Sequence, residues 1–155
     1  MYQPKHFATQ ELIPPCVYNV KGEASLSLMN EGLLRDLDTL HDHLNNIRAG
    51  TTITINNWHG GGPFSERGYR TLNMVGTQIE PHKFGKAVDF SSNKWTPHEI
   101  RQEIIANSAK LVYFTRLEQY LDASHQANHD EIGWVHVDVV PLKDGQHRIY
   151  QFVAA

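Results

Sequence analysis

Leucine residues at helical spacing form the clearest pattern of hydrophobic and polar positions in the chain. Within residues 31–46 the apolar side chains recur every three or four positions and form one stripe, at Leu33, Leu34, Leu37, Leu40 and Leu44. Asn30 directly precedes this stretch, and asparagine is a favoured residue for starting a helix. The pattern predicts a helix that buries its leucine face in the core, and we assign it no chemistry.

The stretch TPHEIRQEIIANSA, residues 96–109, predicts a second helix. Thr96 is a suitable N-cap, and Pro97 fits the first helical position because its ring already fixes a helical φ. Glu99 stands three residues after Thr96 and completes a capping box. The helix is therefore expected to begin at Pro97.

Alternating and β-branched stretches predict the strands of the fold. They lie at residues 51–58, 86–92, 110–118, 134–142 and 147–154. The pair Asp144-Gly145, a strong tight-turn signal, leads into the last of them. We therefore predict an α+β fold with a small, mostly antiparallel sheet and helices packed on one side.

The length of the chain, 155 residues, predicts a single domain that spans residues 1–155. Residues 1–30 look loop-rich and are expected to pack on this domain as an N-terminal extension. One short helical turn is predicted at residues 8–13, and the Pro14-Pro15 pair is expected to end it.

Composition and net charge restrict the classes of binding partner and the cellular compartment that we expect for this chain. The net charge of −3 argues against general binding to a phosphate backbone, so we expect no nucleic-acid partner. Cys16 is the only cysteine, which excludes an internal disulfide. The start, MYQPKHFATQELIPP, has no apolar segment typical of a signal peptide, and no apolar run approaches the ~18 residues of a membrane span. We expect a monomer that is synthesised in the cytoplasm.

The stretch PHKFGKAVDF, residues 81–90, places an imidazole and a carboxylate around small residues. A catalytic zinc ion needs about three nitrogen or oxygen ligands and one open position for water. Gly85 permits a turn between His82 and Asp89, and a strand that starts at Ala87 would carry Asp89. His82 and Asp89 are therefore the first two candidate ligands.

His136 is the candidate for the third ligand. On its predicted strand Val135, Val137 and Val139 share the inward face, while Trp134, His136 and Asp138 share the other. Polar side chains beside an aromatic residue fit the wall of a cleft. They also fit the solvated face of a half-buried strand, so the pattern alone leaves both interpretations open.

Two other histidine patterns do not qualify as zinc sites. HEIRQ, which starts at His98, begins like the helical zinc-peptidase motif, but Gln102 stands where the second histidine is needed. His125 and His129 have the spacing of a helical metal site, but their neighbours are all polar. We interpret His98 as a first-turn helix residue and the other two as part of a solvated loop.

Taken together and in this order, GYRT, HKFGKAVDF and WVHVD resemble the zinc D-alanyl-D-alanine carboxypeptidase-like peptidases. This family includes bacterial cell-wall peptidases, vancomycin-resistance dipeptidases and phage endolysins, and the wider layout looks closest to a phage-encoded branch. The matching positions, spread over about residues 50–140, are Tyr69, Arg70, His82, Gly85, Ala87, Asp89, Trp134, His136 and Asp138. The resemblance implies a hedgehog-like zinc peptidase fold, one Zn²⁺ bound by His82, Asp89 and His136, and hydrolysis of peptide bonds in peptidoglycan stem peptides or cross-links.

Two positions depart from the family pattern. Many members have a serine two residues before the first ligand histidine, where this chain has Glu80. Many also have an acidic catalytic base three residues before the last histidine, where this chain has Gly133. The second departure means that the base has to be sought elsewhere in the chain.

Three acidic residues are candidates for catalytic roles. Glu118 would lie beside His136 if its strand pairs antiparallel with the strand of His136. Glu131 lies five residues before His136, in a loop that could fold back over the metal. Asp138 shares the face of His136 and more naturally orients a ligand imidazole. We favour Glu118 over Glu131 as the proton acceptor, with an ion pair to Arg116 as the alternative role of Glu118.

Substrate binding is assigned to residues near the glycine-rich loop and the last ligand. Arg70 is the candidate for holding the terminal carboxylate of the substrate, because a guanidinium binds a carboxylate through two hydrogen bonds, and Arg67 could exchange roles with it. His59 could polarise the scissile carbonyl or only cap the loop. Tyr69 and Trp134 are candidate groove residues, although aromatic side chains beside strands also pack in cores.

The expected function is that of a zinc metallopeptidase of the D,D-carboxypeptidase or endopeptidase type. We expect it to be phage-derived and to act at the bacterial cell wall, in lysis or as a virion component that penetrates the wall. The alternative is a non-catalytic wall-binding or virion structural module that retains the metal site, an alternative that Gly133 keeps open. A third hypothesis is a metal-free domain in which the histidines coincide by chance.

Overall fold

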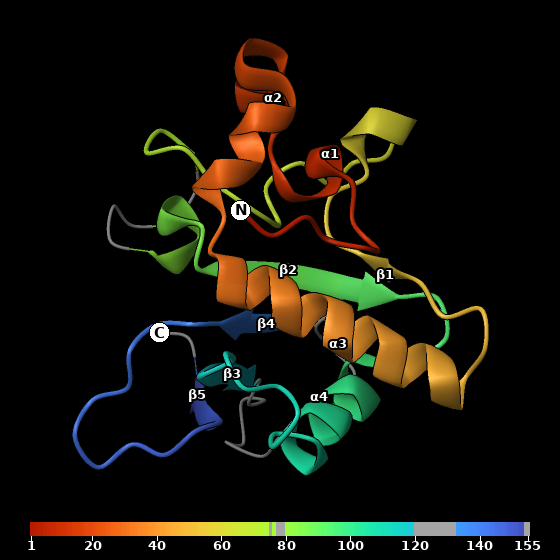
Figure 1. The fold of residues 1–155 in the computed structure, drawn as a ribbon, viewed down its shortest axis with the longest axis vertical. Coiled ribbons are helices and arrows are strands. Elements are labelled where there is room, and N and C mark those ends of the chain that lie inside the picture. The colour runs from red at the N-terminus through yellow and green to blue at the C-terminus, as the bar shows by residue number, and fades with distance from the viewer. Residues whose placement is uncertain (75, 77–79, 120–132, 154–155) are drawn as a thin grey trace.

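Five strands form one mixed sheet in the computed structural model, which describes residues 1–74, 76, 80–119 and 133–153 (Figure 1). In spatial order the strands are β1 (Ile53–Thr54), β2 (Ala87–Ser92), β4 (Val135–Asp138), β3 (Arg116–Gln119) and β5 (Tyr150–Val153). The first three neighbouring pairs are antiparallel, and the pair β3–β5 is parallel. The predicted α+β class is confirmed, and the sheet is mixed rather than purely antiparallel.

The parallel pairing of β5 has a topological cause. The predicted turn at Asp144-Gly145 forms, and the N–H of Gln146 donates to the carbonyl oxygen of Lys143 at 3.0 Å. However, β4 is already paired with β2 on one side and β3 on the other, so it offers no edge on which the chain could fold back. The chain therefore continues to the outer edge of β3, where β5 pairs in parallel.

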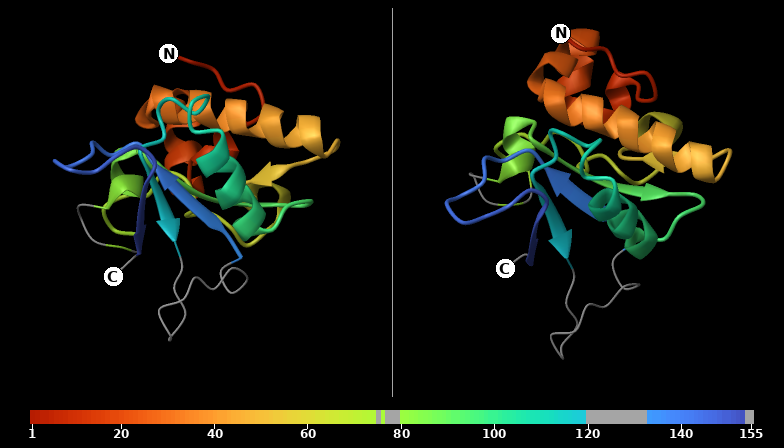
Figure 2. Two further views of the ribbon diagram at one scale, coloured as in Figure 1. Left: turned by 90° about the horizontal axis from the view of Figure 1, so that it is seen from below. Right: turned by 60° about the horizontal axis from the view of Figure 1, so that its bottom comes forward.

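The helical segments of the described chain are α1 (Thr9–Leu12), α2 (Pro15–Lys21), η1 (Gly22–Leu28), α3 (Glu31–Ile47), η2 (Trp58–Gly60), η3 (Pro81–Phe84) and α4 (Pro97–Ala106). Helices α3 and α4 cover one face of the sheet (Figure 2). The predicted caps are present, since Asn30 accepts the N–H of Leu33 at 3.1 Å and Thr96 forms a capping box with Glu99. Within the described ranges, none of these helices has the length and apolarity needed to cross a membrane.

Residues 1–30 are more helical than the sequence predicted. Pro15 is the first residue of α2 instead of only ending the preceding turn, because proline suits the first position of a helix. The 3-10 helix η1 follows directly. Phe7, Leu12 and Leu26 of this segment are buried in the main core, so the segment builds part of the core rather than only resting on it.

The sheet has one apolar face and one polar face. Its fully buried side chains on the helix side are Val88, Phe90, Leu117, Val135 and Val137. Because side chains alternate along a strand, the residues between these point to the opposite face: Asp89, Glu118, His136 and Asp138. The same alternation that builds the core therefore collects the polar candidates on a single surface.

Asp36 ties α3 to the segment that leads into β3. Its carboxylate is buried, and Oδ2 accepts the backbone N–H groups of Tyr113 and Phe114, both at 2.7 Å. Replacing Asp36 by alanine leaves both donors without this acceptor, so we expect Asp36→Ala to lower the free energy of unfolding by about 2–4 kcal/mol in urea titrations. Asp36→Asn can place a carbonyl oxygen at the same point and should lose much less, and equal losses in the two variants would contradict this role.

Candidate metal centre

Three separate elements bring the predicted ligands together. His82 comes from η3, Asp89 from β2 and His136 from β4, and the register of β2 and β4 sets Asp89 directly opposite His136. Nε2 of His82 lies 3.3 Å from Nδ1 of His136 and 3.4 Å from Oδ1 of Asp89. Nδ1 of His136 lies 2.7 Å from the same oxygen of Asp89. All three side chains are buried or nearly so, and their ligand atoms form one cluster.

These separations fit a tetrahedral metal ion. Ligand atoms that surround zinc at about 2.0–2.1 Å stand about 3.3 Å from one another. The two distances to Nε2 of His82 already have this value, whereas the distance between Asp89 and His136 has the length of a hydrogen bond. A small shift of one side chain would complete three corners of a tetrahedron and leave the fourth for water or substrate.

Hydrogen bonds behind the ligands orient both imidazoles. Nδ1 of His82 lies 2.8 Å from the carbonyl oxygen of Gly68, to which it can donate, and this leaves Nε2 for a metal. Nε2 of His136 lies 3.5 Å from Oδ2 of Asp138, which leaves Nδ1 for the same metal. The two histidines would therefore bind through different ring nitrogens.

Gly85 allows η3 to end where it does. Its φ is +64°, and a Cβ at this position would lie 1.9 Å from the carbonyl oxygen of Leu28. The backbone N–H of Gly85 closes the turn onto the carbonyl oxygen of His82 at 3.1 Å. The glycine predicted to permit a turn between His82 and Asp89 thus does so, and it also lets η3 pack against the N-terminal segment.

The electrostatics of the cluster favour a cation. Burial alone would lower the pKa of His136, but the hydrogen bonds and negative charges of Asp138 and Asp89 raise it to about 9. Burial alone would raise the pKa of Asp89, but hydrogen bonds from His136 and His82 hold it well below its usual range. Two carboxylates therefore face one imidazole from opposite sides, and a divalent ion would supply the positive charge that this arrangement attracts.

Asp138 is engaged by Arg116 as well as by His136. Nε of Arg116 lies 2.9 Å from Oδ1 and 3.0 Å from Oδ2 of Asp138, and Nη2 lies 2.6 Å from Oδ2. Burial would raise the pKa of Asp138, but the hydrogen bonds of His136 and Arg116 hold it below its ordinary value. The predicted role of Asp138 in orienting the ligand imidazole matches this geometry better than a role as a free base.

We expect Asp138→Asn to weaken zinc binding about 10–100-fold, because the amide orients the imidazole of His136 without a negative charge. Competition between the protein and a chromophoric chelator measures this affinity. Asp144→Asn, in the exposed turn before β5, serves as the matched control and should bind zinc like the wild type. Unchanged affinity in folded Asp138→Asn would show that this carboxylate does not support the site.

The three ligands open onto a cavity of about 300 Å³. Its lining residues are Arg70, Glu80, Pro81, His82, Asp89, Arg116, Glu118, Trp134, His136 and Phe152. A volume of this size lies at the lower end of the range for small-molecule sites. The three candidate ligands are therefore accessible to a small molecule that enters the cavity.

Glu118 is the acidic residue that the fold brings to this cavity from β3. Strands β3 and β4 pair antiparallel, which is the condition that the role of Glu118 required. Leu117 lies opposite Val137, and the next step of this register sets Glu118 opposite His136. Burial raises the pKa of Glu118 above its ordinary value, although the charge of His136 opposes the shift. The alternative partner, Arg116, is bound to Asp138 instead.

Of the predicted substrate-binding residues, Trp134 and Arg70 line the cavity and Tyr69 does not. Trp134 lines the cavity and is 40% exposed. Arg70 also lines it, but its guanidinium bonds to Asp89 at 2.9 Å and forms a short ion pair with Glu80, so its fork holds a ligand carboxylate. Tyr69 packs against the core and is not among the residues that line the cavity.

Two other predicted residues, His59 and Arg67, are not among the residues that line the cavity. His59 is exposed in η2, where its ring contacts Trp58 edge to face. Arg67 lines a neighbouring pocket and bonds to Ser91. Glu131 and the pair His125 and His129 lie outside the described residues.

Arg101 is a positioning residue that the sequence analysis missed. It is buried on α4, where Nε donates to the carbonyl oxygen of Glu118 and Nη2 to that of Trp134, both at 3.0 Å. It thereby ties together the ends of β3 and β4 that carry two cavity residues. The sequence signal for this role was the position of Arg101. It follows Ile100 and stands one turn before Ile104 and Ile105, on a part of the helix that is expected to be apolar because it faces the core.

Known proteins were compared with the chain by sequence and by structure. No family model, curated protein or solved structure matches it. The chemistry of the centre is therefore judged from its own residues: two imidazoles and one carboxylate, a typical donor set for catalytic zinc, beside a half-buried acid and a cavity.

Proposed function

We propose that the chain is a zinc-dependent peptidase that hydrolyses peptide bonds in peptidoglycan stem peptides or cross-links. The observation that carries this proposal is the convergence of His82, Asp89 and His136 on the wall of a cavity that also contains Glu118. The order and spacing of the motifs, which resemble the zinc D-alanyl-D-alanine carboxypeptidase-like family with its hedgehog-like fold, supply the substrate class. A phage origin and a role in lysis or wall penetration belong to the same proposal.

Each cavity residue has a chemical task in this proposal. Zinc held by His82, Asp89 and His136 would supply the Lewis acidity that activates water and polarises the scissile carbonyl. Glu118 accepts the proton of the attacking water and passes it to the leaving amine, a task for which a carboxylate with a raised pKa is well suited. Trp134 and Phe152 provide apolar walls for the peptide.

Arg70 and Arg116 act through the carboxylates that they bind. Arg70 holds Oδ2 of Asp89, so that Oδ1 faces the two histidines. Arg116 holds Asp138 behind His136. In this proposal Arg70 positions a ligand, because its guanidinium bonds to both Glu80 and Asp89.

Digestion of defined muropeptides, followed by mass spectrometry, tests the proposal. We expect the zinc-loaded chain to produce new amino termini, a chelator to stop the reaction, and added zinc to restore it. The masses of the products distinguish a carboxypeptidase from an endopeptidase. Zinc-dependent binding to peptidoglycan without new amino termini would instead support the non-catalytic wall-binding module, for which the specific observation is Gly133 in the place of the usual acidic residue.

A further inference from the structure

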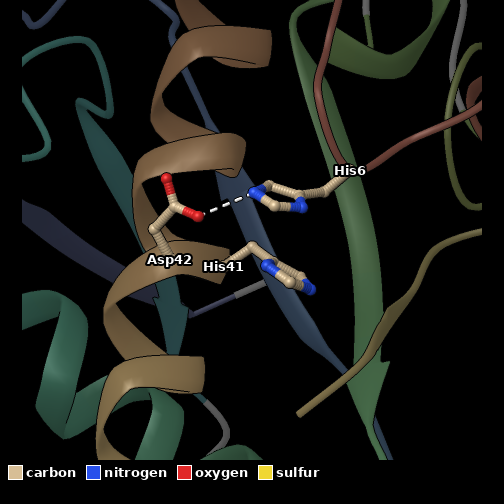
Figure 3. Close-up of side chains that lie close together, drawn as sticks. All are labelled: His6, His41 and Asp42. Atoms are coloured by element: carbon tan, nitrogen blue, oxygen red, sulfur yellow. Dashed lines mark hydrogen bonds and ion pairs between the residues drawn. The ribbon is translucent and has the colours of Figure 1, made fainter. Parts of the chain in front are cut away.

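A second group of potential ligands lies on the helical side of the sheet, away from the cavity. His6 of the N-terminal segment meets His41 and Asp42 of α3, and the three offer ligand atoms that cluster in the same way as those of the first site (Figure 3). We propose that His6, His41 and Asp42 bind a second divalent transition-metal ion, which fastens the N-terminal segment to α3. This site does not depend on the proposed peptidase function.

The ligand atoms of the cluster lie within 4.8 Å of one another. Nε2 of His6 lies 2.7 Å from Oδ1 of Asp42, and the two imidazoles stack with their centroids 3.9 Å apart. Figure 3 shows the ring of His6 lying alongside that of His41, with the carboxylate of Asp42 directed at His6. To bind one ion, the contact between His6 and Asp42 would open to about 3.3 Å, the spacing of ligands around tetrahedral zinc, and the stacked rings would turn so that one nitrogen of each points at the ion.

A buried imidazole nitrogen of His41 that lacks a hydrogen-bond partner in the described part of the chain supports the binding of an ion at this cluster. Nδ1 of His41 is buried, and it has no hydrogen-bond partner among the described residues. Buried polar atoms nearly always have a partner, so one that lacks it calls for an explanation. A metal ion between His41, His6 and Asp42 would provide that partner.

The segment that carries His6 is already fixed in place. The carboxylate of Asp38, on α3, accepts the hydroxyl of Tyr2 at 2.6 Å and the backbone N–H groups of Lys5 at 2.8 Å and His6 at 3.1 Å. Asp38 itself is buried. Little additional ordering is therefore needed for His6 to act as a ligand, which favours binding.

The donor set defines the class of ion. Two imidazoles and one carboxylate suit zinc and its neighbours, such as nickel and copper, whereas magnesium and calcium prefer sites made of oxygen ligands. Nζ of Lys5 lies 3.7 Å from Oδ2 of Asp42, and the exposed side chain of Lys5 can turn away when an ion binds. Because the ligands come from α3 and from a segment more than thirty positions earlier, bound metal is expected to stabilise the fold.

Zinc titration of the metal-free full chain, in competition with a chromophoric chelator, tests this proposal. His6→Gln is the test variant, because its amide can still donate to Asp42 but is a poor zinc ligand. We expect it to bind one zinc ion fewer than the wild type and to lose part of the zinc-dependent rise in melting temperature. His147→Ala removes an exposed histidine and should match the wild type in both measurements.

The same titration in His82→Ala separates the two sites. One zinc ion should remain bound in His82→Ala, its addition should shift the imidazole ¹⁵N resonances of His6 and His41, and His6→Gln added to this variant should abolish binding. If the wild type binds a single ion, and this ion remains bound in His82→Ala but is lost in His6→Gln, the result would support the second site. It would also contradict the candidate metal centre. Equal zinc binding by folded His6→Gln and the wild type would overturn the proposal.

Discussion

His136→Ala is expected to remove zinc from the cavity and to reduce peptidoglycan cleavage by ~10³-fold or more, since water without the metal has a far higher pKa. His136 is the central member of the cluster, because its two ring nitrogens face Asp89 and Asp138. Without the imidazole, two buried carboxylates would lose the group between them, and His82 with Asp89 would provide only two ligands. Metal analysis and the release of amino termini from peptidoglycan measure the two losses in parallel.

His147→Ala is the matched control for this experiment, because His147 is exposed and lies outside the cavity. It should retain both zinc and activity. Circular dichroism establishes that His136→Ala is folded, and folded His136→Ala with full activity would contradict a role of His136 in the reaction. If His136→Ala still cleaved peptidoglycan in a metal-dependent way, the assignment of His82 and Asp89 as ligands would also be contradicted, because two ligands alone would then have to hold the ion.

Glu118→Gln is expected to lower kcat by about 10²–10⁴-fold while zinc binding and KM stay close to those of the wild type. The amide has nearly the same shape as the carboxylate but cannot accept the proton of water. This pattern differs from that of His136→Ala, in which metal and activity are lost together. Steady-state kinetics on a defined muropeptide, combined with zinc analysis, distinguishes the two patterns.

The control for Glu118→Gln is Asp144→Asn, which neutralises an exposed carboxylate that is not among the residues lining the cavity. Its kcat should equal that of the wild type. If Glu118→Gln kept full kcat, Glu118 would not be the proton acceptor. Another acidic residue would then have to take this role, and Glu131 is the next candidate from the sequence.

The periodicity of the sequence predicted the parts of the fold that are local. The leucine stripe of α3, its Asn30 cap and the capping box of α4 each depend on residues within one or two turns, and all are present. The alternation around His136 likewise separated the buried valines from the polar face of β4. The candidate ligands could be found in this way because Asp89 and His136 lie on predicted strands.

Features that depend on which segments meet could not be derived from local patterns. Strand β5 pairs with β3 because β4 is already paired on both sides, and no local pattern in the sequence indicates this pairing. Arg70 was predicted to hold the terminal carboxylate of the substrate, and no sequence pattern indicated that Asp89 and Glu80 would lie against its guanidinium. His6 and His41 form no motif in the sequence, and only the docking of the N-terminal segment on α3 brings them together.

Anomalous scattering at the zinc absorption edge, from crystals of the zinc-loaded chain, tests the central claim most directly. The account predicts a peak on the cavity wall at about 2 Å from Nε2 of His82, Nδ1 of His136 and a carboxylate oxygen of Asp89, which is the normal distance for zinc ligands. The use of Nδ1 by one histidine and Nε2 by the other is a specific part of this prediction. A zinc-loaded crystal with no peak among these three side chains, or with the side chains turned away from one another, would contradict it.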